Sequence, residues 1–532
     1  MVMTTMTEVA RCALFLFHEI SHKTTWAIAA VLLVLPIYSN AADWKITPIL
    51  SSVETYTDNV MLAPRGSESG DFITQINPGI SVTGTGARLK INANYTMQNL
   101  FYLNQNNQST TMHQLDSKAN ATLVKNFLFL DSTANISQQN ISLLGPLTNN
   151  NENITNNRTS IKTYSISPYV LHNFSNFATA QARYTHNAMY TDVGGLSAFQ
   201  SDSMLFNLTS GSAFHKLGWG LTYNQQKMYG FGIPVESELA SGNLRYRVSS
   251  TFSLTGTSGY QKFSYSSVTG VSAGSFWNSG FIWTPSERTN ITANAGKAFF
   301  GNTYTLLASH RARRSTWSLS YNQNITSAFG QSMTPFGQSM TPGTTGIAPF
   351  PDQFGESNFS DTVMPQQTMN ASMPNNGLST YPFNPFNPIN TLTNQFFLQK
   401  SLQATVALTG KRSTLVFSMF HMLMEPQTQG NSTSISLGTN FDTKQIGANA
   451  LWSYKVAPLA NANIGVMYFK SNIPALGQED ETKTFTAGLT QQILPKLNGA
   501  VNFRHIERTS IPNLYGAAYR ENAITATLSM RF

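Results

Sequence analysis

Apolar and polar residues alternate one for one along most of the chain from about residue 44 to its end. In one such segment Leu89, Ile91, Ala93, Tyr95 and Met97 alternate with polar residues. A period of two is the repeat of a β-strand, whose successive side chains point to opposite faces. The segments are about 10–16 residues long, enough for a tilted strand to cross a membrane. The pattern predicts long strands with one apolar and one polar face.

The alternation recurs at 217–224 and at 317–326. In the latter segment the apolar face is predicted to carry Trp317, Leu319, Tyr321 and Ile325. These faces would contact lipid, while Ser, Thr, Asn and Gln would face water inside a barrel. A soluble β-sandwich has shorter strands and more surface charge.

The final strand is the clearest case. Its apolar face carries Ile524, Ala526, Leu528, Met530 and Phe532, and its other face is polar. An exposed apolar strand at a terminus invites edge pairing in a soluble protein, so lipid is the better partner for this face. The end resembles the C-terminal signal of bacterial outer-membrane β-barrels, in which the final Phe is recognised by the barrel assembly machinery. Phe532 is therefore the candidate assembly signal.

Short turns alternate with longer polar connections. Ten short turns are expected, at 84–88, 124–127, 173–176, 215–218, 248–251, 284–288, 313–316, 410–413, 456–459 and 494–497. Short periplasmic turns and long extracellular loops are the rule in outer-membrane barrels, and with both termini periplasmic these turns imply about 22 strands. We predict an all-β transmembrane antiparallel β-barrel of the outer membrane, with an even strand number of about 18–24.

Three parts of the chain are distinguished. Residues 1–41 form a leader with a secretory signal: the short apolar run 26–35 follows Lys23 and precedes small residues, with cleavage expected after Ala41. Residues 42–532 form the barrel. Within it, 329–394 lacks alternation, is rich in Pro, Gly, Met, Phe, Asn and Gln, and repeats Phe-Gly-Gln-Ser-Met-Thr-Pro in tandem. Proline density excludes regular strands there, which leaves an extracellular coil or a plug inserted into the lumen.

Composition supports the barrel. Charged residues make up 11% of the 532-residue chain, against about 25% in soluble globular proteins. The mean hydropathy is only −0.18, and the mature chain has no apolar run of about 18 residues that would indicate a transmembrane helix. The single cysteine, Cys12, lies in the leader, which suits an envelope compartment.

Charge is polarised along the barrel axis. Basic residues cluster at the predicted periplasmic turns, while acidic residues favour the opposite end. By alternation five of the basic residues point into the lumen: Lys90, Arg245, Arg247, Arg311 and Arg313. This basic mouth could attract an anionic solute or polymer. Alternatively, its Lys and Arg side chains only reach towards the membrane interface and keep the turns hydrated.

Other chemistry is poorly supported. No hydrolase, zinc-protease or phosphate-binding motif is present, so we expect no enzyme and no cofactor. The methionines of 329–394 could ligate Cu(I), but no paired His or Cys supports them, and no metal site is assigned. The pI of about 9.3 could suggest nucleic-acid binding, but the basic residues are dispersed and the protein is exported.

A family resemblance lies near the N-terminal end of the barrel. It is carried by the stretches 53–64 (VETYTDNVMLAP), 71–81 (DFITQINPGIS), 84–89 (GTGARL) and 95–102 (YTMQNLFY). These resemble the outer-membrane barrel proteins associated with PEP-CTERM/exosortase systems, a porin-like family found with exopolysaccharide synthesis. The tandem-repeat segment looks like an insertion in that family.

The resemblance implies a role in exopolysaccharide export or in surface display of PEP-CTERM proteins. The implied partners are outer-membrane lipid, the barrel assembly machinery, polysaccharide and periplasmic export components, with no nucleic acid. Two alternatives remain open from the residues: a general diffusion porin for small solutes, and a structural or adhesive surface barrel that presents the long loop.

Overall fold

The computed structural model describes residues 43–148, 150–193, 198–230, 234–265, 270, 272–327, 395–428, 441–511 and 518–532. The predicted leader (1–41) and the predicted long loop (329–394) lie outside the described residues. Among the described residues, no helix is long and apolar enough to cross a membrane.

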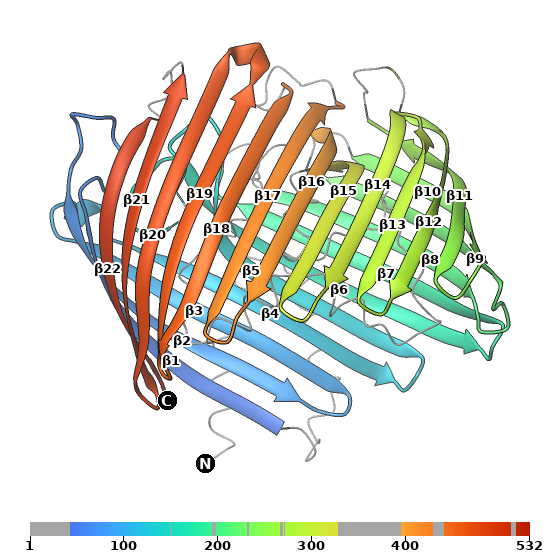
Figure 1. The fold of residues 1–532 in the computed structure, drawn as a ribbon, viewed down its shortest axis with the longest axis horizontal. Coiled ribbons are helices and arrows are strands. Elements are labelled where there is room, and N and C mark those ends of the chain that lie inside the picture. The colour runs from blue at the N-terminus through green and yellow to red at the C-terminus, as the bar shows by residue number, and fades with distance from the viewer. Residues whose placement is uncertain are drawn as a thin grey trace.

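One antiparallel sheet of 22 strands makes up the fold (Figure 1). Each strand pairs with the next in sequence, and β1 pairs with β22 from Ile49–Arg531 to Thr57–Ala523, so the sheet closes on itself. The strands are β1 (Asp43–Thr57), β2 (Asp71–Thr85), β3 (Leu89–Tyr102), β4 (Thr110–Val124), β5 (Leu128–Asn140), β6 (Arg158–Phe174), β7 (Ala178–Thr191), β8 (Ala198–Ser210), β9 (Leu217–Tyr229), β10 (Val235–Arg247), β11 (Phe252–Phe263), β12 (Ala273–Ser286), β13 (Thr289–Ala298), β14 (Gly301–Arg311), β15 (Ser315–Ser327), β16 (Phe396–Thr409), β17 (Ser413–Pro426), β18 (Thr443–Ala457), β19 (Ala460–Ile473), β20 (Gln478–Leu494), β21 (Leu497–Ile511) and β22 (Tyr519–Arg531). Single 3₁₀ turns lie at Asn106–Gln108 and Pro474–Leu476.

The ten predicted short turns all join consecutive strands at one end of the barrel, the end at which β22 finishes (Figure 1). By the rule for outer-membrane barrels this end is periplasmic. The longer connections lie at the opposite, extracellular end. The predicted fold class and the strand number of 22 are confirmed.

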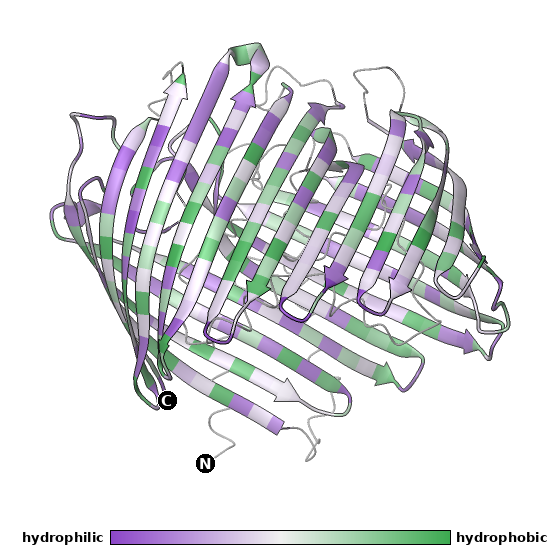
Figure 2. Cartoon of the chain, in the orientation of Figure 1, coloured by the Kyte–Doolittle hydropathy of each residue, from purple (hydrophilic) through white to green (hydrophobic). Residues whose placement is uncertain are grey.

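The faces of the strands follow the predicted alternation. Exposed apolar side chains such as Leu221, Leu244, Trp317 and Val501 lie outside, and apolar and polar bands alternate along each strand in Figure 2. The inner positions carry mostly Asn, Gln, Ser and Thr. The pairing of β1 with β22 leaves neither terminal strand of the sheet as an open edge in lipid, and the chain thus has the fold of an outer-membrane β-barrel.

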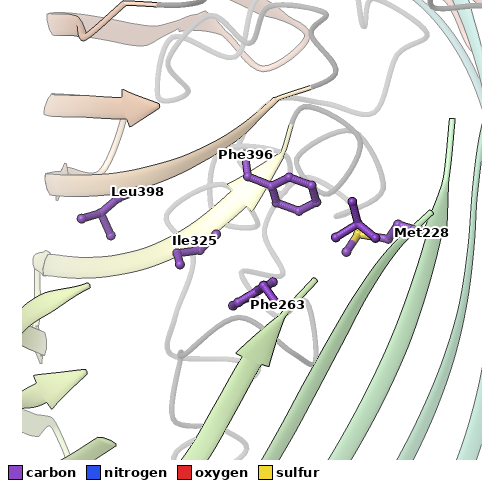
Figure 3. Packing of buried hydrophobic residues seen from close by; sticks show 6 residues of the cluster. Met228, Phe263, Ile325, Phe396 and Leu398 are labelled. Carbon is purple, nitrogen blue, oxygen red and sulfur yellow. The ribbon is translucent and has the colours of Figure 1, made fainter. Parts of the chain in front are cut away.

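One strand departs from the predicted pattern. Ile325 was expected on the lipid face of β15, but it is 1% exposed and packs in an apolar cluster with Met228 of β9 and Phe263 of β11. The extracellular half of β15 therefore lies against the inner wall of the barrel instead of facing lipid (Figure 3). Alternation predicts which side of a strand is apolar, but not what covers that side.

Candidate functional site: the lumen and its constriction

The connection between β5 and β6, residues 141–157, is described except at 149, and its described residues fold into the barrel and across its inner wall. It begins beside β5 and β6, yet its Leu143 and Leu147 pack against Phe420 of β17 and Phe469 of β19. These strands lie far along the barrel wall from β5 and β6. The connection therefore narrows the extracellular half of the lumen, and we call residues 141–157 the constriction loop.

A buried ion pair network fixes the constriction loop to the wall. Glu152 of the loop lies 3.4 Å from Arg504 of β21, and Arg504 also contacts Glu521 of β22 at 3.1 Å. The Glu521 side chain is fully buried. Asn153 of the loop donates to the same carboxylate at 2.7 Å. One arginine thus bridges two carboxylates, one from the loop and one from the wall, where a charge without any partner would be costly.

Hydrogen bonds extend this attachment to three further strands. Glu152 accepts from Thr55 of β1 at 3.1 Å and from Gln75 of β2 at 3.2 Å. The Tyr102 hydroxyl of β3 donates to the Glu152 carbonyl at 2.9 Å. Charged acceptors strengthen such bonds in a low-dielectric site, so Glu152 is the central anchor of the loop.

The apolar end of the loop has its own polar anchor. The Arg508 guanidinium of β21 donates to the Leu143 carbonyl at 2.9 Å and contacts Asp480 of β20 at 3.0 Å. The Tyr519 hydroxyl of β22 donates to the Leu147 carbonyl at 2.5 Å. Leu143 and Leu147 are thus fixed in two ways. Their carbonyls accept hydrogen bonds, and their side chains pack against Phe420 and Phe469.

The periplasmic mouth is lined differently. Lys90, Arg245, Arg247 and Arg311 fall on the lumen side of their strands by alternation with exposed outer residues such as Leu244 and Tyr246. Arg313 lies in the turn between β14 and β15, where strand alternation assigns it no face. The structure adds further basic residues on inner positions at this end, namely Lys45, Lys455 and Arg531.

The structure does not gather these basic residues into one patch. They come from β1, β3, β10, β14, β18 and β22, which are spread around the barrel. A ring of like charge around a mouth acts on the whole cross-section of the lumen, as in charged pores. Their distribution favours a general field over a single binding pocket.

Four acidic residues at the extracellular end form ion pairs with Lys or Arg. Glu236 pairs with Lys227 at 2.8 Å, Glu479 with Lys470 at 2.7 Å, and Glu481 with Lys483 at 2.9 Å. Asp480 pairs with Arg508 at 3.0 Å. The acidic outer rim expected from the sequence is thus partly neutralised, because these four carboxylates have cationic partners on the same strand or on a neighbouring strand.

The constriction loop was not predicted from the sequence, although an apolar stretch at its start was a signal for it. Residues 141–147 read Ile-Ser-Leu-Leu-Gly-Pro-Leu within an otherwise polar connection. Apolar residues in an extracellular loop need burial, and the described barrel offers it only on the inside. Among the described residues there is no group of His, Cys, Asp and Glu that could hold a metal ion.

Comparison with known proteins gives structural likeness only. No family model and no curated protein matches the chain. The siderophore receptor PirA from Pseudomonas aeruginosa is 9% identical with a TM-score of 0.45, covering 93% of this chain and 81% of its own. The FrpB iron transporter from Neisseria meningitidis is 10% identical with a TM-score of 0.49, covering 92% and 81%. OccAB1 from Acinetobacter baumannii is 8% identical with a TM-score of 0.34, covering 92% and 96%.

Proposed function

We propose that the protein is an outer-membrane pore that exports an anionic, hydroxyl-rich polymer, an exopolysaccharide of an exosortase-associated system. The observation that carries the proposal is the combination of a neutral polar inner wall with a ring of Lys and Arg at the periplasmic mouth. Asn, Gln, Ser and Thr exchange hydrogen bonds with sugar hydroxyls at little net cost, so a chain can slide past them. The ring would draw acidic sugars inward from the periplasm.

The constriction loop fits this role. It narrows the lumen near the extracellular exit, so that a flexible polymer could pass in single file while bulkier molecules are held back. The loop is attached at several points, and its sequence is rich in Asn. The resemblance near the N-terminal end of the barrel supplies the link to exopolysaccharide and to PEP-CTERM surface systems.

Planar-bilayer recording tests the proposal. The reconstituted protein should form channels that prefer anions in a salt gradient, and a uronic-acid polysaccharide should block them when added from the periplasmic side. Replacing Arg245, Arg247 and Arg311 with Gln should reduce both the anion preference and the block. Anion channels without polysaccharide block would favour a general diffusion porin, and cation preference would contradict the proposed role of the basic mouth.

A further inference from the structure

A cluster of charged and aromatic side chains lies on the inner wall of β5, β6 and β7, just above the periplasmic mouth. Asp131 is the fourth residue of β5, which begins after a periplasmic turn. Arg183 of β7 precedes Tyr184, which is exposed on the outer face, so by alternation Arg183 points into the lumen. The side chains of Arg183 and Asp131 are 22% and 29% exposed. A solute in the lumen can therefore reach this ion pair.

The Arg183 guanidinium is fixed by two neighbours. Its central carbon lies 3.9 Å from the centroid of the Tyr169 ring of β6, and its Nη1 donates to Asp131 Oδ2 at 2.9 Å. Phe129 of β5 stacks on Tyr169 with ring centroids 5.0 Å apart. The Asn120 amide of β4 donates to Asp131 Oδ1 at 2.7 Å. The guanidinium is thus oriented before a ligand binds, which lowers the entropy cost of binding.

The guanidinium keeps donors for a ligand. A guanidinium carries five N–H donors in a planar fork, and the bond to Asp131 uses one of them. A carboxylate can accept two parallel hydrogen bonds from such a fork. Arg183 can therefore bind a carboxylate from the lumen while Asp131 stays bound. At the constriction, Arg504 bridges two carboxylates in the same manner.

Positive charge surrounds this ion pair. Across the strand ladders Lys90 of β3 is opposite Asn120, and Asn120 is opposite Asp131, a row of roughly 10 Å. Lys118 is two residues from Asn120 and lies on the same inner face of β4. Asp116 follows on that face. With the arginine, three cations thus face two carboxylates, and the patch keeps an excess positive charge.

We propose that this cluster, Asp131, Tyr169 and Arg183 with Lys90 and Lys118, binds one acidic sugar residue of a polymer in the lumen, a uronate. The sugar carboxylate accepts from Arg183, and the two lysines attract it. Hydroxyls of the sugar donate to Asp131. A neutral sugar lacks the charged hydrogen bonds, which are the stronger ones. The inference rests on the proposed export of an acidic polysaccharide, and it adds a defined binding position to the general field of the basic mouth.

Binding of short oligosaccharides to the full chain in detergent micelles tests the proposal without requiring transport. Saturation-transfer NMR would compare trigalacturonate with the neutral galactose trimer of the same linkage. The site variant, Arg183→Gln/Asp131→Asn, removes both charges and leaves the net charge unchanged. The matched control, Lys227→Gln/Glu236→Gln, removes an exposed ion pair elsewhere on the barrel. We expect the site variant to bind trigalacturonate about ten-fold more weakly, the loss of one charged hydrogen bond, and the control to bind it as the original protein does.

A second pair of variants separates orientation from charge. Tyr169→Leu keeps every charge but removes the ring beside the guanidinium, and it should weaken binding about two- to five-fold. Tyr169→Phe keeps the ring and should bind normally. Equal affinity of the site variant and the original protein for trigalacturonate would overturn the site. Equal affinity of the original protein for the acidic and the neutral trimer would overturn the carboxylate chemistry.

The outcomes also separate this site from the pore proposal. If the trimers bind as expected but polysaccharide does not block the reconstituted channel, the export role fails and the site stands. If polysaccharide blocks the channel but the site variant binds trigalacturonate as the original protein does, the export role stands and the site fails. Heat-modifiable migration on gels checks that each variant is folded.

Discussion

At the scale of single residues, the constriction depends on few charges. Arg504 holds Glu152 and Glu521 together, and each of these carboxylates also accepts from a threonine of β1, Thr55 or Thr57. A charge buried without its partner costs far more than a surface pair contributes. Substitution of Arg504 should therefore lower the stability of the barrel strongly, whereas substitution in an exposed ion pair should change it little.

Arg504→Leu should destabilise the barrel strongly, because it leaves Glu521 buried without a counter-ion. We expect the free energy of unfolding to fall by ~3–5 kcal/mol, measured by urea titration of tryptophan fluorescence in vesicles. Lys470→Met, which breaks the exposed pair with Glu479, is the control and should change stability little. Similar losses in both variants would show that the Arg504 network has no special role.

At the scale of elements, the sequence predicted the strands and the short turns. It did not predict where a strand or a loop leaves the barrel wall and packs inside the lumen. All ten turns were found because short polar breaks between period-two runs are a local property. The constriction loop and the inward turn of β15 depend on contacts between strands far apart in sequence. Ile325 shows the limit: its position in the alternation is apolar, as predicted, yet its partners are Met228 and Phe263 instead of lipid.

The same limit applies to the candidate site. Lys90, Arg245 and Arg247 could be assigned to the lumen side from neighbouring apolar residues alone, whereas Arg313 could not, because it lies in a turn. The Glu152–Arg504 pair joins residues 352 positions apart, and no local pattern marks it. Alternation thus predicts a face, while the pairing of charges requires the closed barrel.

Releasing the constriction loop should widen the pore. In a Leu143→Asn/Leu147→Asn variant the loop loses its packing against Phe420 and Phe469. Burial of each leucine contributes roughly 1.5–3 kcal/mol, so the 141–147 end of the loop should detach while the strands stay folded and Glu152 stays paired with Arg504. Limited proteolysis of intact vesicles should cut within 141–157 in the variant and spare the original protein. Equal cleavage in the two would show that the leucines do not hold the loop.

At the scale of the whole molecule, closure of the sheet determines whether the protein can exist in a membrane. The nine pairs between β1 and β22 close the barrel, and the Phe532 amide donates to the Pro48 carbonyl at 3.0 Å beyond them. An open edge would leave backbone groups unpaired in lipid at several kcal/mol each.

Removal of Phe532 tests the terminal residue separately from closure. If Phe532 is an assembly signal, deletion should reduce the amount of folded barrel in the outer membrane in cells, while refolding of purified protein into vesicles is nearly unchanged. Heat-modifiable migration measures both. A refolding defect as large as the defect in cells would assign Phe532 a structural role instead.

The central claim, a water-filled pore narrowed by the constriction loop and preceded by a basic mouth, is tested most directly by single-channel recording. The original protein should be compared with a variant in which 142–156 is replaced by a short Gly-Asn turn, each in a salt gradient. We predict a larger conductance in the shortened variant, with anion preference retained in both because the basic mouth is unchanged. Unchanged conductance, or preference for cations in the original protein, would contradict the account.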